Sequence, residues 1–289
     1  RVVQRAHRGS AEALGRQPRR QRLRLAGVPA PDEHARQRPR RAMRGDQVRR
    51  QENRVAGKGA AGGLEPRLAQ LSRLAPAEDV GGDYVDVRPS NDGTWVAVGD
   101  VSGHGISAGV TMFMIQSAMA AICGGSKRPS QVVRQLNDVL YENIRLRRKA
   151  DDYVTFVAAH ISREGRLRYS GGHLDILVLR RRTRALEVVH TRGAWIGAYP
   201  DIDHALFDDE LVLEEGDLVV LYTDGVTEAM NEAREQFGPE RLHALVAEAV
   251  EQDTDVLLQK LLDALAGWTK RDVADDDITV VVVRALPRA

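Results

Sequence analysis

The stretch VAVGDVSGHGISAGV, residues 96–110, sets the framework of the fold. Its valine-rich first part is typical of a β-strand, and this strand ends next to Asp100. Gly103 and Gly105 follow directly and allow the sharp backbone turn that a change from strand to helix needs. The residues from Ile106 onward have a helix-compatible composition. We therefore predict a strand, a glycine turn and a helix in direct succession, with an acidic residue at the turn.

Working outward, DYVDVRP (83–89) and TWVAVGDV (94–101) are predicted to be two strands. SNDG (90–93) separates them and contains an Asn-Asp-Gly hairpin signal. Two helices are predicted next in order, over 106–122 and 129–147. Beyond them, short apolar runs with tight turns predict an antiparallel meander. Its strands are 153–162, 166–172, 175–182 and 185–190.

The last part of the domain adds two more predicted strands and a second pair of helices. A buried strand, GDLVVLYTDG (216–225), precedes two amphipathic helices over 239–250 and 254–268, and DDITVVVVRA (276–285) is the final strand. Strands and paired helices in this order indicate an α+β fold and not alternating parallel βαβ units. We expect helices to cover the outer faces of two antiparallel sheets.

Composition divides the chain into two parts. Residues 1–65 are Arg-rich and have few aromatics, so we expect a disordered tail there and a folded domain over 66–289. Residues 1–66 hold 17 Lys and Arg against 6 Asp and Glu, which leaves 25 against 35 for the remainder. The acidic domain repels nucleic acid and attracts cations, so a phosphate substrate would be held through metal ions.

The single cysteine, Cys123, lies in a small-residue and apolar run, which predicts a buried structural thiol. Neither a disulfide framework nor a thiolate metal site is available, and a reducing compartment fits best. No apolar stretch reaches the roughly 20 residues needed to cross a bilayer. We therefore expect a cytoplasmic protein.

Four acidic sites share one context, because each lies at a strand end or in a glycine-bearing turn. They are Asp83, Asp100, Asp224 and the triplet 275–277. Each alone is also typical of an ordinary turn. No basic residue accompanies any of them in sequence, and charges beside buried strands are costly unless they are paired or metal-bound. Together they predict a site for hard divalent cations such as Mg²⁺ or Mn²⁺.

Five motifs occur in an order that resembles the PPM-type protein phosphatases of the SpoIIE branch, bacterial relatives of protein phosphatase type 2C. They are PAEDVGGDYVDV, VAVGDVSGHGISAGV, GDLVVLYTDGVTEAMN, FGPERL and DDDITVVVVR. The resemblance covers about residues 66–286. It implies a four-layer αββα sandwich that carries two Mn²⁺ or Mg²⁺ ions.

The resemblance also implies the ligands. Asp100 would bridge both ions, the carbonyl of Val101 would add an oxygen, and Asp83 would assist at the first ion. Asp224 and Asp276 would hold the second ion, with Asp277 as the alternative to Asp276. Asp100, Asp83 and Asp224 would thereby serve catalysis, in which a cation-activated water attacks phosphoserine or phosphothreonine.

By the same resemblance, the substrate would be a phosphorylated regulatory protein, such as a STAS-type anti-sigma-factor antagonist. No membrane and no nucleic acid is expected as a partner. His104 is interpreted as a loop-stabilising residue, and His173 in SGGHLD as a structural one. The phosphate-binding arginine of the family, near the N-terminal strand, has no evident counterpart here. Met112, Met114 and Met119 are interpreted as packing residues.

Other functions fit parts of the sequence. A catalytically silent pseudophosphatase that acts as a regulatory binding module would keep the fold, although such a copy need not retain all four acidic sites. Nucleic-acid binding through residues 1–60 would rest on arginine clusters that lack interleaved aromatics. A nucleotide cyclase reading of GGDY lacks the acidic and aromatic continuation. The natural substrate, the activating signal, the preferred metal and the oligomeric state stay open.

Overall fold

The computed structural model describes residues 68–75, 81–123, 127–270 and 276–285, and only the backbone of the first of these ranges. The predicted tail of residues 1–65 lies outside this part of the chain, as does Asp275. In the described part, no helix is both long and apolar enough to span a bilayer.

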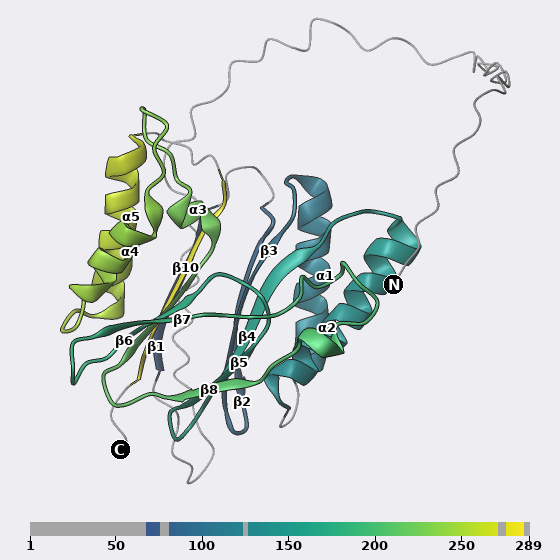
Figure 1. The fold of residues 1–289 in the computed structure, drawn as a ribbon, viewed down its shortest axis with the longest axis horizontal. Helices are drawn as coiled ribbons and strands as arrows, with labels where there is room; N and C mark the ends of the chain where they lie inside the picture. The colour runs from purple at the N-terminus through teal and green to yellow at the C-terminus, as the bar shows by residue number, and fades with distance from the viewer. Residues whose placement is uncertain (1–67, 76–80, 124–126, 271–275, 286–289) are drawn as a thin grey trace, which may run out of the picture. The chain divides into compact units, whose positions relative to one another are not determined.

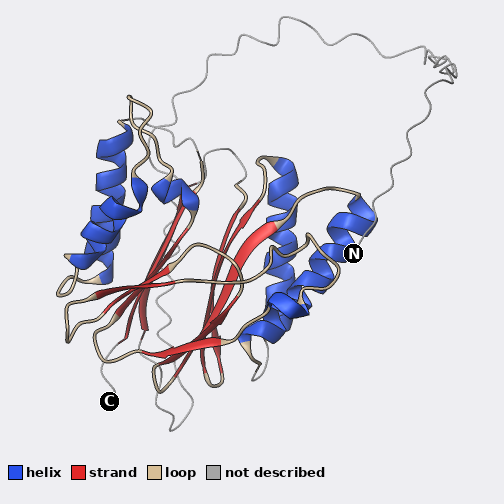
Figure 2. Cartoon of the chain, viewed as in Figure 1, coloured by secondary structure: helices blue, strands red, loops and turns tan. Residues whose placement is uncertain are grey.

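Two five-stranded antiparallel sheets form the centre of the domain (Figures 1 and 2). Sheet A consists, in spatial order, of β1 (Leu68–Ala75), β10 (Ile278–Ala285), β9 (Leu218–Tyr222), β6 (Ile176–Leu179) and β7 (Leu186–Val189). Sheet B consists of β2 (Asp83–Ser90), β3 (Gly93–Val101), β4 (Val154–Ser162), β5 (Arg166–Ser170) and β8 (Asp209–Val212). Valine-rich inner faces bury one large cluster between the sheets, with Val96, Val157, Val219 and Val281 among its members.

Helices cover the outer face of each sheet, as Figure 2 shows. The covering helices are α1 (Ile106–Ile122) and α2 (Pro129–Tyr141) on sheet B, and α4 (Gly238–Ala247) and α5 (Thr254–Thr269) on sheet A. Shorter elements are the π-helix η2 (Glu142–Arg148), the 3₁₀ helix η3 (Asp203–Ala205) and α3 (Asp224–Thr227). The predicted α+β fold with αββα layers is confirmed.

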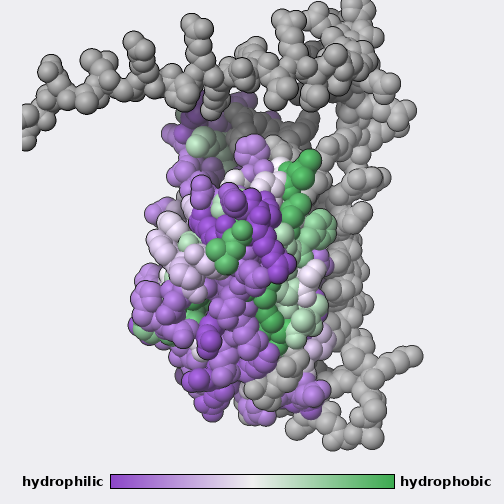
Figure 3. Space-filling view, turned by 90° about the vertical axis from the view of Figure 1, so that its right-hand side faces the viewer, coloured by the Kyte–Doolittle hydropathy of each residue, from purple (hydrophilic) through white to green (hydrophobic). Residues whose placement is uncertain are grey.

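The packing residues behave largely as predicted. Met119 of α1 is fully buried in the apolar cluster between the helices and sheet B, and Met112 and Met114 pack against that cluster. Cys123 is a buried free thiol, and burial raises its pKa to about 11. The face formed by α1 and α2 also carries exposed apolar side chains, visible as green areas in Figure 3. Ile106 and Phe113 of α1 are the largest of them on this helix.

Three details differ from the sequence predictions. The predicted hairpin of β2 and β3 is present, and Ser90 lies opposite Gly93 in it, but the expected meander is wrong. The chain leaves sheet B after β5 and enters sheet A with β6, and Gly171 at the crossing has a φ of 118° that favours glycine. β1 was not anticipated, and the helix expected over 129–147 changes to π-helical geometry at Glu142.

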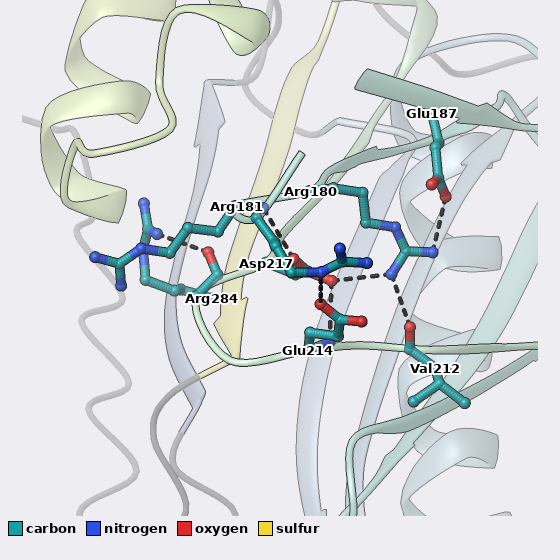
Figure 4. Close-up of polar contacts among 9 residues, drawn as sticks. Arg180, Arg181, Glu187, Val212, Glu214, Asp217 and Arg284 are labelled. Atoms are coloured by element: carbon teal, nitrogen blue, oxygen red, sulfur yellow. Dashed lines mark hydrogen bonds and ion pairs between the residues drawn. The ribbon is translucent and has the colours of Figure 1, made fainter. Parts of the chain in front are cut away.

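A buried carboxylate closes the end of sheet A that holds the start of β9 (Figure 4). Asp217 has no solvent exposure and accepts hydrogen bonds from Arg180 Nη1 (2.9 Å) and from the backbone N–H groups of Arg181 (3.0 Å) and Glu214 (2.9 Å). Arg180 also donates to the carbonyl of Val212. The charge of Asp217 therefore has a basic partner in Arg180, as a buried ion pair requires.

We expect Asp217→Ala to lower the free energy of unfolding by about 3 kcal/mol or more, because three donors and the Arg180 charge lose their acceptor. Urea denaturation followed by circular dichroism measures this loss. Glu215→Ala, at the exposed neighbouring position, is the control and should change stability little. Equal midpoints for the two variants would contradict a stabilising role for Asp217.

Candidate functional site

The register of sheet B brings two predicted residues side by side. Asp83 on β2 lies opposite Asp100 on β3, and Asp100 lies opposite Thr155 on β4. Directly opposite residues in antiparallel strands share one face of the sheet. Asp100 is in phase with Val96 and Val98, which belong to the cluster between the sheets, so its side chain faces sheet A.

Sheet A contributes acidic residues at the same end of the sandwich. β9 ends at Tyr222 and leads through Thr223 into α3, which begins at Asp224. β10 begins just after Asp276 and Asp277, and it runs antiparallel to β9. Figure 1 shows α3, the start of β10 and the start of α1 at one end of the two sheets. Segments far apart in the sequence thus meet there.

Asp83 joins the two sheets through hydrogen bonds. Its Oδ2 accepts from the hydroxyls of Thr223 (2.8 Å) and Thr279 (2.7 Å), and all three side chains are buried. Burial raises the pKa of Asp83 to about 8, against the opposing effect of the two hydroxyls, and the negative charges of Asp100 and Asp277 raise it further. Asp83 therefore fixes the position of the strand ends around it.

Asp277 joins the sheets a second time through the backbone. Its Oδ2 accepts from the N–H of Gly82 at 2.6 Å, which holds the GGD turn against the start of β10. Glycine is needed at position 225 as well, because a Cβ there would collide with the carbonyl oxygen of Asp277. The predicted segments GGD and TDG are consequently interlocked with Asp277.

Asp100 is the electrostatic centre of the cluster. Burial raises its pKa to about 7, and the charges of Asp224, Asp276 and Asp277 add to the shift. Partial burial of its carboxyl group also raises the pKa of Asp276, together with the charges of Asp224 and Asp277. Within the described chain, the carboxylate of Asp100 has neither a hydrogen bond nor a basic partner. In this part of the chain the charge of Asp100 is therefore not compensated by a direct basic partner, whereas the charge of His104 acts to lower the pKa of Asp276.

The donor chemistry of these residues fits a hard divalent cation, since all are carboxylates. Their spacing does not yet complete a site. Over the residues that the structure describes, no three histidine, cysteine, aspartate or glutamate side chains stand close enough to hold one metal ion. Asp277 is committed to the Gly82 N–H, whereas Asp276 is exposed. Binding a cation would require Asp100, Asp224 and Asp276 to draw together.

A cavity of about 470 Å³ opens beside the carboxylates and is lined by both Asp100 and Asp224. His173 also lines it and links the two sheets there. Its Nε2 lies 3.0 Å from the carbonyl of Tyr222, so Nε2 carries the proton, and Nδ1 accepts from the hydroxyl of Thr155 at 2.9 Å. Burial lowers the pKa of His173 to about 4, which keeps the ring neutral. These contacts fit the predicted structural role.

The turn between β3 and α1 has the geometry that its glycines predict. Gly103 and Gly105 have φ values of 86° and 75°, in the left-handed region. Ser102 ties the turn to sheet B, since its N–H donates to the carbonyl of Tyr153 and its hydroxyl accepts from the N–H of Tyr153. Helix α1 therefore starts within a few residues of Asp100.

Several site residues were not identified from the sequence. Thr223 and Thr279 hold Asp83, and the only sequence signal for them is their place next to the predicted aspartates. Arg192 and Trp195 line the cavity and come from the segment between β7 and η3. Their position depends on contacts between distant segments, so no local pattern identifies them.

Comparisons with known proteins place this arrangement in context. Residues 90–286, more than half of the chain, match the SpoIIE family, described as stage II sporulation protein E. The phosphoserine phosphatase RsbU of Bacillus subtilis is 29% identical over 211 residues, which cover 72% of this chain and 61% of RsbU. Protein IcfG of Synechocystis is 25% identical, and 36% of its length is covered. The chain thus spans less than two thirds of the length of either relative.

Solved structures share the fold. The SiaA-PP2C domain of Pseudomonas aeruginosa superposes with a TM-score of 0.64 at 20% identity, over 74% of this chain and 85% of that domain. The structure of RsbX in complex with magnesium superposes with a TM-score of 0.55 at 13% identity, over 77% of this chain and 98% of RsbX. Two antiparallel sheets flanked by helices are therefore a known PP2C-type architecture.

The pKa of Asp100 makes stability depend on pH in a defined direction. Because the pKa is raised from 3.8 to about 7, the folded protein keeps a proton that the unfolded chain has already released in this range. Stability contributed by this group is complete below about pH 4 and is lost as the pH rises through 7. In buffer without divalent cations, Asp100→Asn should therefore be more stable than wild type at pH 8, by on the order of 2 kcal/mol.

Thermal and urea denaturation at pH 4.5 and pH 8 test this expectation. The advantage of Asp100→Asn should shrink toward the acidic end, and Asp138→Asn, at an exposed position on α2, should show no such trend. An advantage that is equal at both pH values would show that ionisation of Asp100 is not its cause.

Proposed function

The chain belongs to the SpoIIE family, and from this membership and the geometry of the acidic cluster we propose that it is a metal-dependent protein serine/threonine phosphatase. The observation that carries the proposal is the cluster itself. The negative charges of Asp224 and Asp276, next to strands of sheet A, raise the pKa of Asp100 on sheet B. A cavity lies beside Asp100 and Asp224. A surplus of buried negative charge next to a cavity is suited to binding cations and, through them, a phosphate group.

The proposed ligands are those that the resemblance to the family implies. Asp100, the carbonyl of Val101, Asp224 and Asp276 would hold two Mn²⁺ or Mg²⁺ ions, with Asp83 assisting directly or through water. The exposure of Asp276 favours it over Asp277, whose carboxylate is occupied by the N–H of Gly82. When bound, such ions supply an activated water and neutralise charge on the phosphate.

The protein's own groups favour attack by water and not by a side chain. Two hydroxyls line the cavity, and both are engaged: Thr155 donates to His173 Nδ1, and Thr191 donates to the carbonyl of His173. His173 is neutral and uses both ring nitrogens. Cys123 lies elsewhere, buried in the cluster under α1. Although the Thr155 hydroxyl donates to His173, the pKa of about 4 makes that ring too weak a base to activate Thr155 as the nucleophile of a covalent mechanism.

In this mechanism the chain's residues hold and orient the reacting groups. Asp83, through Thr223 and Thr279, keeps the ends of β2, β9 and β10 in register, which sets Asp100 against Asp224. His173 adds a second link between β4 and the end of β9. In-line attack depends on this alignment, since small displacements of reacting groups reduce rates strongly.

The proposed substrate is a phosphorylated regulatory protein, such as an anti-sigma-factor antagonist of the STAS type. The support is the similarity to RsbU, which is named a phosphoserine phosphatase. The match covers 61% of RsbU, and the assignment of the substrate rests on analogy with that protein. We propose a cytoplasmic location on the same ground.

One observation favours a second function. The carboxylates do not form a group of three that is close enough for one metal ion in the described chain. A pseudophosphatase that binds a partner through the same fold would need no such convergence. Calorimetric titration with Mn²⁺ separates the two functions: the phosphatase should bind the ion, and Asp100→Ala should weaken binding about tenfold or more. No detectable binding by the wild-type protein would favour the binding module.

The direct test is hydrolysis of p-nitrophenyl phosphate and of a phosphoserine peptide in the presence of Mn²⁺. We expect activity that EDTA removes, and a decrease of kcat/KM of about 100-fold or more in Asp100→Ala and Asp224→Ala. Asp138→Ala, an exposed aspartate on α2, is the matched control and should retain activity. Activity that survives EDTA and both site substitutions would rule out the proposed mechanism.

A further inference from the structure

The cavity beside the carboxylates extends beyond the space that a phosphate needs. Its volume is about 470 Å³, and Arg192 and Trp195 line it together with Asp100 and Asp224. Both belong to the segment between β7 and η3, and neither has a part in the reaction proposed above.

Trp195 presents an apolar surface whose position is fixed. Half of its surface is exposed, and its ring stacks on Tyr153 with 4.6 Å between centroids and 15° between planes. Hydrogen bonds hold the backbone at each of the two stacked rings. Ile196, next to Trp195, exchanges two hydrogen bonds of 3.0 Å with Val154, and Tyr153 is bound by Ser102. A rigid, half-exposed indole next to a cavity suits an apolar side chain of a ligand.

Arg192 presents hydrogen-bond donors whose charge is already compensated. Its Nε and Nη2 donate to the two carboxylate oxygens of Asp209, at 3.0 and 2.8 Å, and the guanidinium lies 4.3 Å from the ring centre of Phe207. Nη1 makes no hydrogen bond within the described chain. Asp209 already compensates the charge of Arg192 and occupies Nε and one N–H of Nη2, which weakens the attraction of Arg192 for a phosphate dianion. Nη1 instead suits a neutral acceptor such as a main-chain carbonyl.

We infer that Arg192 and Trp195 form a recognition wall for the polypeptide that flanks the phosphorylated residue. Trp195 packs against an apolar side chain next to the phosphoserine or phosphothreonine, and Nη1 of Arg192 binds a main-chain carbonyl of the same segment. The inference rests on the proposed phosphatase function and makes the enzyme selective for phosphopeptides with apolar neighbours. Both residues are specificity determinants that do not contact the phosphoryl group.

The experiment compares three substrates with Mn²⁺ present. They are p-nitrophenyl phosphate, the peptide acetyl-Ala-Leu-pSer-Leu-Ala-amide and the same peptide with Asp in place of both Leu. We expect wild type to prefer the Leu peptide. Trp195→Ala should lower kcat/KM for it by about tenfold, mainly through KM, and should lower that for p-nitrophenyl phosphate much less. Arg192→Ala should affect both peptides more than p-nitrophenyl phosphate.

Conservative and distant variants complete the design. Trp195→Phe keeps an aromatic platform and should regain most of the preference for the Leu peptide. Val256→Ala on α5 and Arg182→Ala, whose exposed side chain pairs with Glu214, remove similar groups elsewhere and should leave all three substrates unaffected. Equal losses on the peptides and on p-nitrophenyl phosphate in Trp195→Ala and Arg192→Ala would overturn the recognition wall.

Failure of the proposed function is separable from failure of this inference. Inactivity of the wild type toward all three substrates would refute the phosphatase function, and calorimetric binding of the Leu peptide would then decide on the wall. Weaker binding by Trp195→Ala than by Val256→Ala would support it. Binding that is equal in these two variants, or absent in the wild type, would overturn it.

Discussion

One buried carboxylate, shared by two threonine hydroxyls, determines how the two sheets meet. Asp83 comes from sheet B, and Thr223 and Thr279 come from sheet A, so the hydrogen bonds cross the layer between the sheets at its polar end. The apolar cluster fixes the distance between the sheets. Because the hydrophobic effect is non-directional, the cluster does little to fix how the two sheets are aligned along their strands. Directional hydrogen bonds to a buried acceptor remove that freedom, because an unmatched partner would be costly.

Aspartate has opposite roles at the two ends of the sandwich. At one end, Asp217 is surrounded by donors and by the guanidinium of Arg180, and its charge is matched. At the other, Asp100 and Asp224 have other carboxylates as neighbours, and burial raises the pKa of Asp100. The first arrangement stabilises the fold. The second is electrostatically unfavourable until a cation or a proton binds, which is typical of a functional site.

Much of this architecture was predictable, and the exceptions have physical causes. The strands ending near Asp100 and Asp224 were recognisable because a valine-rich run meets a Gly-bearing turn at each. The passage between sheets at Gly171 was not, since short apolar strands suit either sheet equally. β1 was missed because LAQLSRLA lacks a clear period of two. The placement of Trp195 depends on a stacking partner 42 positions away, Tyr153, and such contacts leave no local pattern.

The pairing of β1 with β10 has a consequence for biosynthesis. Leu68 lies opposite Ala285, so the first and last described strands are neighbours in sheet A, and β10 stands between β1 and β9. A ribosome delivers residues in order, and the position between β1 and β9 stays empty until the final strand has emerged. Asp276 arrives with it. The proposed metal site would therefore be completed only after translation of the domain ends, when β10 pairs with β1 and β9.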